Sequence, residues 1–107
     1  MSDEPVELNA AELRQKLNLE TGKLPWSELQ RHFARGVVVV VGPELDLIEV
    51  AAAFVEDNKQ QIEQWIQQEQ LARAHDEHAL KWTEQEPDFW SVVVAPWVIV
   101  QEIRTHG

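Results

Sequence analysis

The sequence has no cysteine, and this absence excludes several kinds of chemistry at once. A chain without thiols forms no disulfide, uses no cysteine nucleophile and offers no thiolate ligand to zinc. Long hydrophobic runs are also missing, since no unbroken apolar stretch approaches the roughly 20 residues that span a bilayer. Residues 1–5 are acidic and lack the basic and apolar regions of a signal peptide. We therefore expect a cytoplasmic protein that does not enter the membrane.

Positive charge is scarce as well. The sequence contains 9 lysine and arginine residues against 19 aspartate and glutamate residues, which gives a formal net charge of −10. Such a charge disfavours nucleic-acid phosphates and anionic lipid surfaces, and the few basic residues do not cluster with aromatic ones. We expect no nucleic-acid and no membrane partner. The acidic surface keeps the protein in solution and suits a basic protein partner.

The common sequence signatures of enzymes are absent too. No glycine-rich dinucleotide or phosphate loop occurs, and no serine stands in a Gly-x-Ser-x-Gly turn. The serines are Ser2, Ser27 and Ser91, and none of them has the context of an activated nucleophile. The sequence therefore predicts no cofactor and favours a non-enzymatic function.

Five consecutive valines, residues 37–41, are the strongest structural signal that is present. Gly36 precedes the run, and Gly42-Pro43 follows it as a turn. Successive side chains of a strand point to opposite faces, so a strand with one wet face shows apolar and polar residues in alternation. Because this run is apolar throughout, both of its faces need cover. The pattern predicts a strand at about 37–41 near the centre of a sheet.

A second apolar block, residues 92–100, predicts two terminal strands at about 90–95 and 97–102. We expect a bend at Pro96, because proline has no N–H to donate to the hydrogen bonds of a sheet. Residues 71–74 are either a short strand or a loop. Helical periodicity and cap residues predict about five helices: 10–20, 25 or 26 to 35, 45 or 46 to about 56, 59 to about 69, and 76 or 77 to 85. Leu80 is an expected core contact of the last helix, and Trp82 can lie on the same side. We predict an α+β fold in which helices pack on a small mixed sheet. Residues 1–8 are expected to form a short polar tail, and residues 9–107 a single domain.

Cover for the valines can come from two sources. Helices can lie on both faces of the sheet, or a second copy of the chain can bury the open face or edge. If helices cover only one face, at least two valines meet water, and each forfeits about 1.5–3 kcal/mol relative to burial. On this ground we expect a homodimer.

His75 and His78 belong to the one cluster of metal-type ligands, His75-Asp76-Glu77-His78. Zinc usually requires a third protein ligand, which Asp76 or Asp88 would have to supply. The same residues are typical of a helix N-terminus, where caps and acidic groups gather. We prefer that interpretation, predict no metal site, and retain the two histidines as weak candidates.

Acidic and aromatic residues supply the remaining candidates. Asp46 and Glu49 lie at the start of a predicted helix, where they complement its dipole, although paired carboxylates also serve acid–base chemistry. Five tryptophans are rich usage for this length. Trp26 and Trp65 are expected in the core. Trp90 and Trp97 flank the terminal strand block and, with Pro96, are the candidates for a ligand pocket or an interface.

Three stretches together resemble a known family: residues 26–30 (WSELQ), 45–50 (LDLIEV) and 90–102 (WSVVVAPWVIVQE). They are similar to the small bacterial proteins grouped as domain of unknown function 2288. The resemblance covers about residues 10 to 103, and the last stretch is its most specific part. It implies a bacterial, cytoplasmic, single-domain protein and supplies no catalytic residues.

Two functional hypotheses follow. The first is a non-enzymatic, homodimeric interaction module or accessory subunit. The alternative is a small-molecule-binding protein or enzyme with a pocket near Trp90 and Trp97 and an acidic residue such as Asp46 or Glu49. A concave pocket that holds a tryptophan and a buried carboxylate favours the alternative, and a flat apolar face closed by a second copy favours the first.

Overall fold

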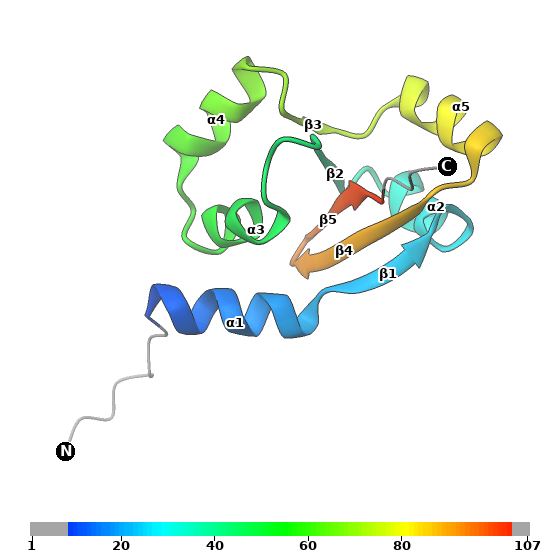
Figure 1. The fold of residues 1–107 in the computed structure, drawn as a ribbon. Helices are drawn as coiled ribbons and strands as arrows, with labels where there is room; N and C mark the ends of the chain where they lie inside the picture. The colour runs from blue at the N-terminus through cyan, green and yellow to red at the C-terminus, as the bar shows by residue number, and fades with distance from the viewer. Residues whose placement is uncertain (1–8, 104–107) are drawn as a thin grey trace.

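The computed structural model describes residues 9–103, and the polar tail predicted at 1–8 lies outside them. The described chain forms five helices and five strands (Figure 1). In chain order they are α1 (Ala10–Glu20), β1 (Gly22–Pro25), α2 (Trp26–Ala34), β2 (Val38–Val41), α3 (Leu47–Val55), α4 (Lys59–Gln67), β3 (Leu71–Arg73), α5 (Asp76–Gln85), β4 (Asp88–Val94) and β5 (Trp97–Glu102). The predicted α+β class, the five helices and the two terminal strands are confirmed.

Cap residues fix the helix ends where the sequence places them. The side chain of Asn9 accepts the backbone N–H of Glu12, and this pair forms a capping box at the start of α1. Gly36 follows α2 with a φ of 73°, in the left-handed region that glycine enters without a steric penalty. Its N–H donates to the carbonyl of Phe33 at 2.9 Å, which closes the last turn. The valine strand can therefore start directly after the helix.

The strands form one mixed sheet in the order β1-β4-β5-β2-β3. The β2 and β5 strands are parallel, with Val39 opposite Ile99, and the other three pairs are antiparallel. The valine strand is thus an interior strand beside the terminal block, as expected, while β5 occupies the middle position. Residues 71–73, left open by the sequence, pair with β2 as an edge strand.

The β1 strand was not expected, because Thr21, Gly22 and Lys23 indicate only the end of α1. They do end it, since the Thr21 hydroxyl donates to the carbonyl of Leu17 at 2.8 Å. The chain then continues as an edge strand in which Lys23 stands opposite Trp90. Four residues with a lysine and a proline carry too little apolar periodicity to predict a strand.

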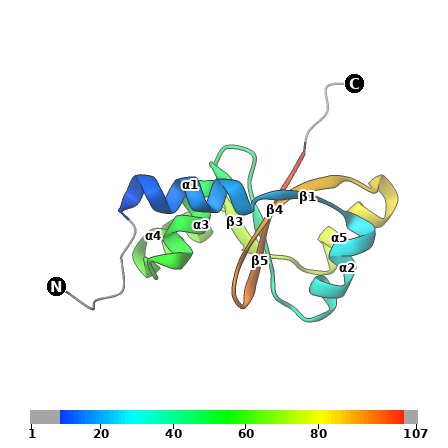
Figure 2. The same ribbon diagram turned by 90° about the horizontal axis from the view of Figure 1, so that it is seen from below.

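Helices cover both faces of the sheet (Figure 2). On one face Val39 and Val41 pack with α1 and α3, and on the other Val38 packs with Trp26 of α2 and Trp82 of α5. These three valines are buried within a single chain. Helices on both faces of the sheet therefore provide the cover that the valines require. The valine run alone no longer calls for a second copy, and the homodimer remains a prediction.

The tryptophans divide between core and surface. Trp26 is 5% exposed in the core, and Trp65 is half-buried against the α1 and α3 side. The expectation that Leu80 is a core contact of α5 was wrong, because Leu80 is 71% exposed and Trp82 is the buried residue of that helix. A short amphipathic helix buries its largest apolar side chain first, and that rotation turns Leu80 outward. No helix within residues 9–103 is long and apolar enough to cross a membrane.

Candidate functional site

The candidate site is a cavity of about 460 Å³ above strands β4 and β5. The end of α1 and the start of α3 form its sides, and the two strands contribute its floor. We call it the α1–α3 cavity. Its lining residues are Asn18, Thr21, Asp46, Leu47, Ile48, Trp90 and Gln101.

Trp90 is the large aromatic residue of this cavity. Its side chain lies on the face of β4 that carries α1 and α3, yet Trp90 remains 41% exposed. Trp26 and Trp82, by contrast, are 5% and 1% exposed. The ammonium group of Lys23 lies 5.5 Å from the Trp90 ring centroid, a cation–π distance. Trp90 thus presents an indole surface that the fold does not use for its core.

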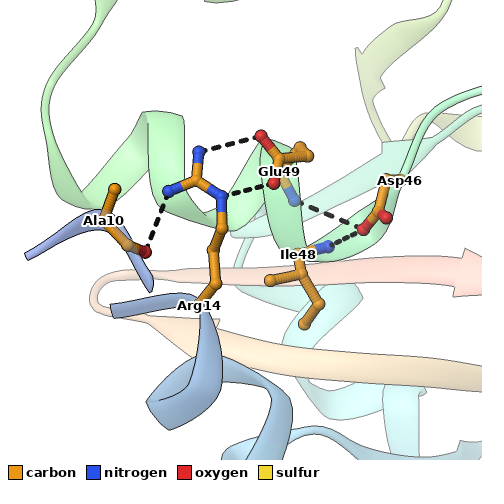
Figure 3. A network of polar contacts seen from close by, with 5 residues as sticks. All are labelled: Ala10, Arg14, Asp46, Ile48 and Glu49. Carbon is orange, nitrogen blue, oxygen red and sulfur yellow. Dashed lines mark hydrogen bonds and ion pairs between the residues drawn. The ribbon is translucent and has the colours of Figure 1, made fainter. Parts of the chain in front are cut away.

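Asp46 contributes a carboxylate from the N-cap of α3. One oxygen, Oδ1, accepts the backbone N–H groups of Ile48 at 2.8 Å and Glu49 at 3.4 Å (Figure 3). These bonds use the helix donors that would otherwise attract an anion. Oδ2 is the remaining oxygen of this exposed side chain. The carboxylate is therefore held in place by the helix start but is exposed, so the cavity provides the expected tryptophan and a carboxylate, although not a buried one.

Gln101 contributes a fixed amide from β5. Its Nε2 donates to the carbonyl of Gly42 at 2.8 Å and to that of Leu45 at 2.7 Å. Because an amide nitrogen carries two hydrogens, both donors are used and the orientation of the side chain is set. Oε1 remains as an acceptor. The same two bonds hold the loop between β2 and α3, and this loop carries Asp46 to the cavity.

Glu49, the other acidic candidate, points to α1 instead. Arg14 forms a two-pronged ion pair with it, from Nε to Oε2 and from Nη2 to Oε1, the latter at 2.8 Å (Figure 3). Arg14 Nη1 also donates to the carbonyl of Ala10 at 3.0 Å. The hydrogen bond from Arg14 lowers the pKa of the Glu49 carboxyl below its usual range. Glu49 therefore ties α3 to α1 and does not line the cavity.

Pro96 and Trp97 also lie away from the cavity. Pro96 is exposed in the turn between β4 and β5. Trp97 is half-buried, with its ring edge-on to Phe54 at a centroid distance of 6.4 Å. The guanidinium of Arg73 lies 5.2 Å from the Trp97 centroid on another side. These contacts give Trp97 a packing role at the end of the hairpin.

The histidine cluster forms a helix start. The backbone N–H of His75 donates to Nδ1 of His78 at 3.1 Å, and the two rings are in tilted contact with centroids 4.1 Å apart. Burial, and then the positive charge of a protonated His75, lower the pKa of His78. Within residues 9–103 no three His, Asp or Glu side chains gather as a metal site would require.

The structure thus brings together two of the predicted site residues, Trp90 and Asp46, and separates Glu49, Pro96 and Trp97 from them. Sequence reasoning missed Asn18, Thr21 and Gln101. For Gln101 a signal existed, since it is a polar residue on the apolar Trp97–Ile99 side of a strand. For Asn18 and Thr21 no local signal existed, because only the packing of α1 beside β4 brings them to the site. An exposed carboxylate beside an indole and a fixed amide is suited to binding, and it lacks a nucleophile with an adjacent base.

The chain belongs to a family whose description is "Protein of unknown function (DUF2288)", and the family model matches residues 12–102. The resemblance noted in the sequence is therefore confirmed. A similar solved structure is the NMR solution structure of PA1075 from Pseudomonas aeruginosa. It is 36% identical, has a TM-score of 0.77, and the match covers 97% of this chain and 95% of that one. A comparison with curated proteins found no match. These comparisons support the fold and the family, and they assign no activity.

Proposed function

We propose that the protein is a non-catalytic binding module for a small molecule, with its site in the α1–α3 cavity. The observation that carries the proposal is Trp90, an indole that is 41% exposed on the floor of a cavity of about 460 Å³. Small-molecule sites typically enclose about 300–1,000 Å³ and combine apolar or aromatic walls with a few fixed polar groups. Trp90, Leu47 and Ile48 form the apolar part, and Asp46 and Gln101 form the fixed polar part.

A screen of small molecules by two-dimensional NMR tests this proposal. We expect the compounds that bind to shift the indole N–H of Trp90 and the backbone N–H groups of Leu47 and Ile48. Trp90→Leu should remove the binding. Val93→Ala is the matched control, because Val93 lies on the same strand but its side chain points to the opposite face. Shifts that map to another part of the chain, or a screen without any binder, would overturn the proposal.

A second candidate is the homodimeric interaction module predicted from the sequence. The observation that favours it is Val93, which is 62% exposed on the sheet face that also carries Val98. An exposed valine on a strand suits contact with another chain. The net charge of −10 suits a basic partner, and the composition suits the bacterial cytoplasm. Light scattering over a range of concentrations tests self-association, and a monomer at every concentration would rule out the dimer. Val93→Asp should shift a real dimer to monomer.

A further inference from the structure

We infer that the ligand of the α1–α3 cavity is a small organic cation, namely a protonated amine attached to a flat, apolar body. This inference rests on the proposed function and specifies its ligand class. It follows from which hydrogen-bonding atoms of the cavity remain for a ligand, from the charge at the site, and from the exposed indole.

The atoms that remain are mostly acceptors. Oδ1 of Asp46 and both Nε2 hydrogens of Gln101 are used within the protein, which leaves Oδ2 of Asp46 and Oε1 of Gln101. The Thr21 hydroxyl donates its hydrogen to the carbonyl of Leu17, so its oxygen can offer only acceptor lone pairs to a ligand. Asn18 is the lining side chain that adds donors. A ligand rich in N–H donors satisfies this set, whereas a carboxylate or phosphate would meet acceptors.

The local charge points the same way. Asp46 contributes a negative charge to the cavity. Arg14 of α1, whose charge interacts with that of Asp46, is held by Glu49, and the N–H groups of Ile48 and Glu49 at the start of α3 are held by Asp46 itself. The overall charge of −10 adds a field that draws cations to the surface. The positive charge of Lys23, which lies over the ring of Trp90, acts against the binding of a cation.

Trp90 provides the surface for the apolar body. An indole face attracts cations and stacks with flat rings. Lys23 demonstrates the first property, since its ammonium group already lies 5.5 Å from the ring centroid. Leu47 and Ile48 extend the apolar wall next to the carboxylate of Asp46. A ring that stacks on Trp90 therefore lies in the same cavity as the carboxylate of Asp46, which an attached amine can contact.

Three probes that share an indole ring and differ in the charge of the side chain test the ligand class: tryptamine (positive), indole (neutral, without a side chain) and indole-3-acetate (negative). Binding is followed by NMR titration of the wild-type protein. We expect tryptamine to bind about fivefold more tightly than indole, the upper range for one partly exposed ion pair, and indole-3-acetate to bind more weakly than indole. Asp46→Asn should abolish the preference for tryptamine while retaining the helix cap, because asparagine is an equally good N-cap residue.

Glu44→Gln is the matched control. It removes one negative charge from the same loop, outside the cavity lining, and should leave the preference unchanged. Indole-3-acetate binding as tightly as tryptamine, or a preference that survives in Asp46→Asn, would overturn the ligand class while the binding function stands. Binding of none of the three probes at Trp90 would overturn the ligand class and count against the proposed function itself.

Discussion

His75 and His78 lie in contact at the start of α5, with ring centroids 4.1 Å apart and ring planes tilted by 54°, and Nδ1 of His78 accepts the backbone N–H of His75. This acceptor exists only while His78 is neutral at Nδ1. His78 also lies against the ring of Trp82, at a centroid distance of 5.2 Å, and Trp82 is the residue that anchors α5 in the core. The protonation of His78 is therefore linked to the packing of α5 against the core.

The first prediction concerns pH. Because burial lowers the pKa of His78 in the folded chain, the unfolded chain takes up the proton first as the pH falls. Stability is complete above the unfolded value of about 6.5 and declines below it. The charged neighbours that act on His78 are His75 and Lys81, which lower its pKa further, and Glu77 and Glu102, which raise it.

Urea unfolding between pH 8 and pH 5 measures this decline. We expect His78→Gln to reduce the pH dependence in this range. His32→Gln, which changes a histidine of α2 outside the His75–His78 pair, serves as the control. An unchanged pH dependence in His78→Gln would contradict the assignment.

The second prediction concerns the cap of α3. Asp46→Ala removes the acceptor of two backbone N–H groups and should lower the free energy of unfolding by about 1 kcal/mol. Asp46→Asn should lower it by much less, because its side-chain oxygen still caps the helix. Chemical denaturation of both variants distinguishes the cap from the charge. Equal losses in the two variants would show that the charge is responsible.

The third prediction concerns Gly36. Gly36→Ala places a side chain at a φ of 73° and should cost roughly 1–2 kcal/mol. Space is not the cause, since the added Cβ would approach Arg73 Nη2 no closer than 3.4 Å. Gly22→Ala is the matched control: it adds a methyl group where nothing lies within 4 Å, and it should be nearly neutral. A Gly36→Ala protein as stable as the wild type would contradict the expectation.

The fourth prediction concerns the ion pair between α1 and α3. Arg14 lowers the pKa of Glu49, so the pair stabilises the fold above the ordinary carboxyl pKa of 4.5, and this contribution disappears as the pH falls through the lowered value. The pair is solvent-exposed, and its contribution should be small and decrease with salt. A double-mutant cycle with Arg14→Leu and Glu49→Gln at low and high salt measures it. A coupling independent of salt would contradict this account.

The helices could be predicted from the sequence because their signals are local. Asn9, Asp46 and Asn58 each cap the helix that follows, and Gly36 ends α2. The order of the strands could not be predicted, since pairing partners are far apart in the chain and several registers bury the same valines. The short β1 strand forms because β4 offers it a partner, and a partner has no signature in the four residues themselves.

The candidate site shows the same division. Trp90 could be identified because a tryptophan stands beside an apolar strand block, and Asp46 because an acidic residue stands at a predicted helix start. Asn18 and Thr21 could not, because polar residues of these types are ordinary at a helix end and gain significance only where α1 packs beside β4. Glu49 and Asp46 are both acidic residues at the start of the same predicted helix. Only the ion pair of Glu49 with Arg14, on a different helix, distinguishes the two.

The position of β5 affects how the protein is made. It is the last strand of the described chain to leave the ribosome, yet it lies between β4 and β2, and its Val98 pairs with Val38 about 60 residues earlier. Until residues 97–102 emerge, β2 and β3 have no link to β1 and β4, and the valines of β2 have only the short edge strand β3 as a partner. The sheet is therefore completed only after synthesis has passed β5, and the nascent chain must keep its valine run from aggregating until then.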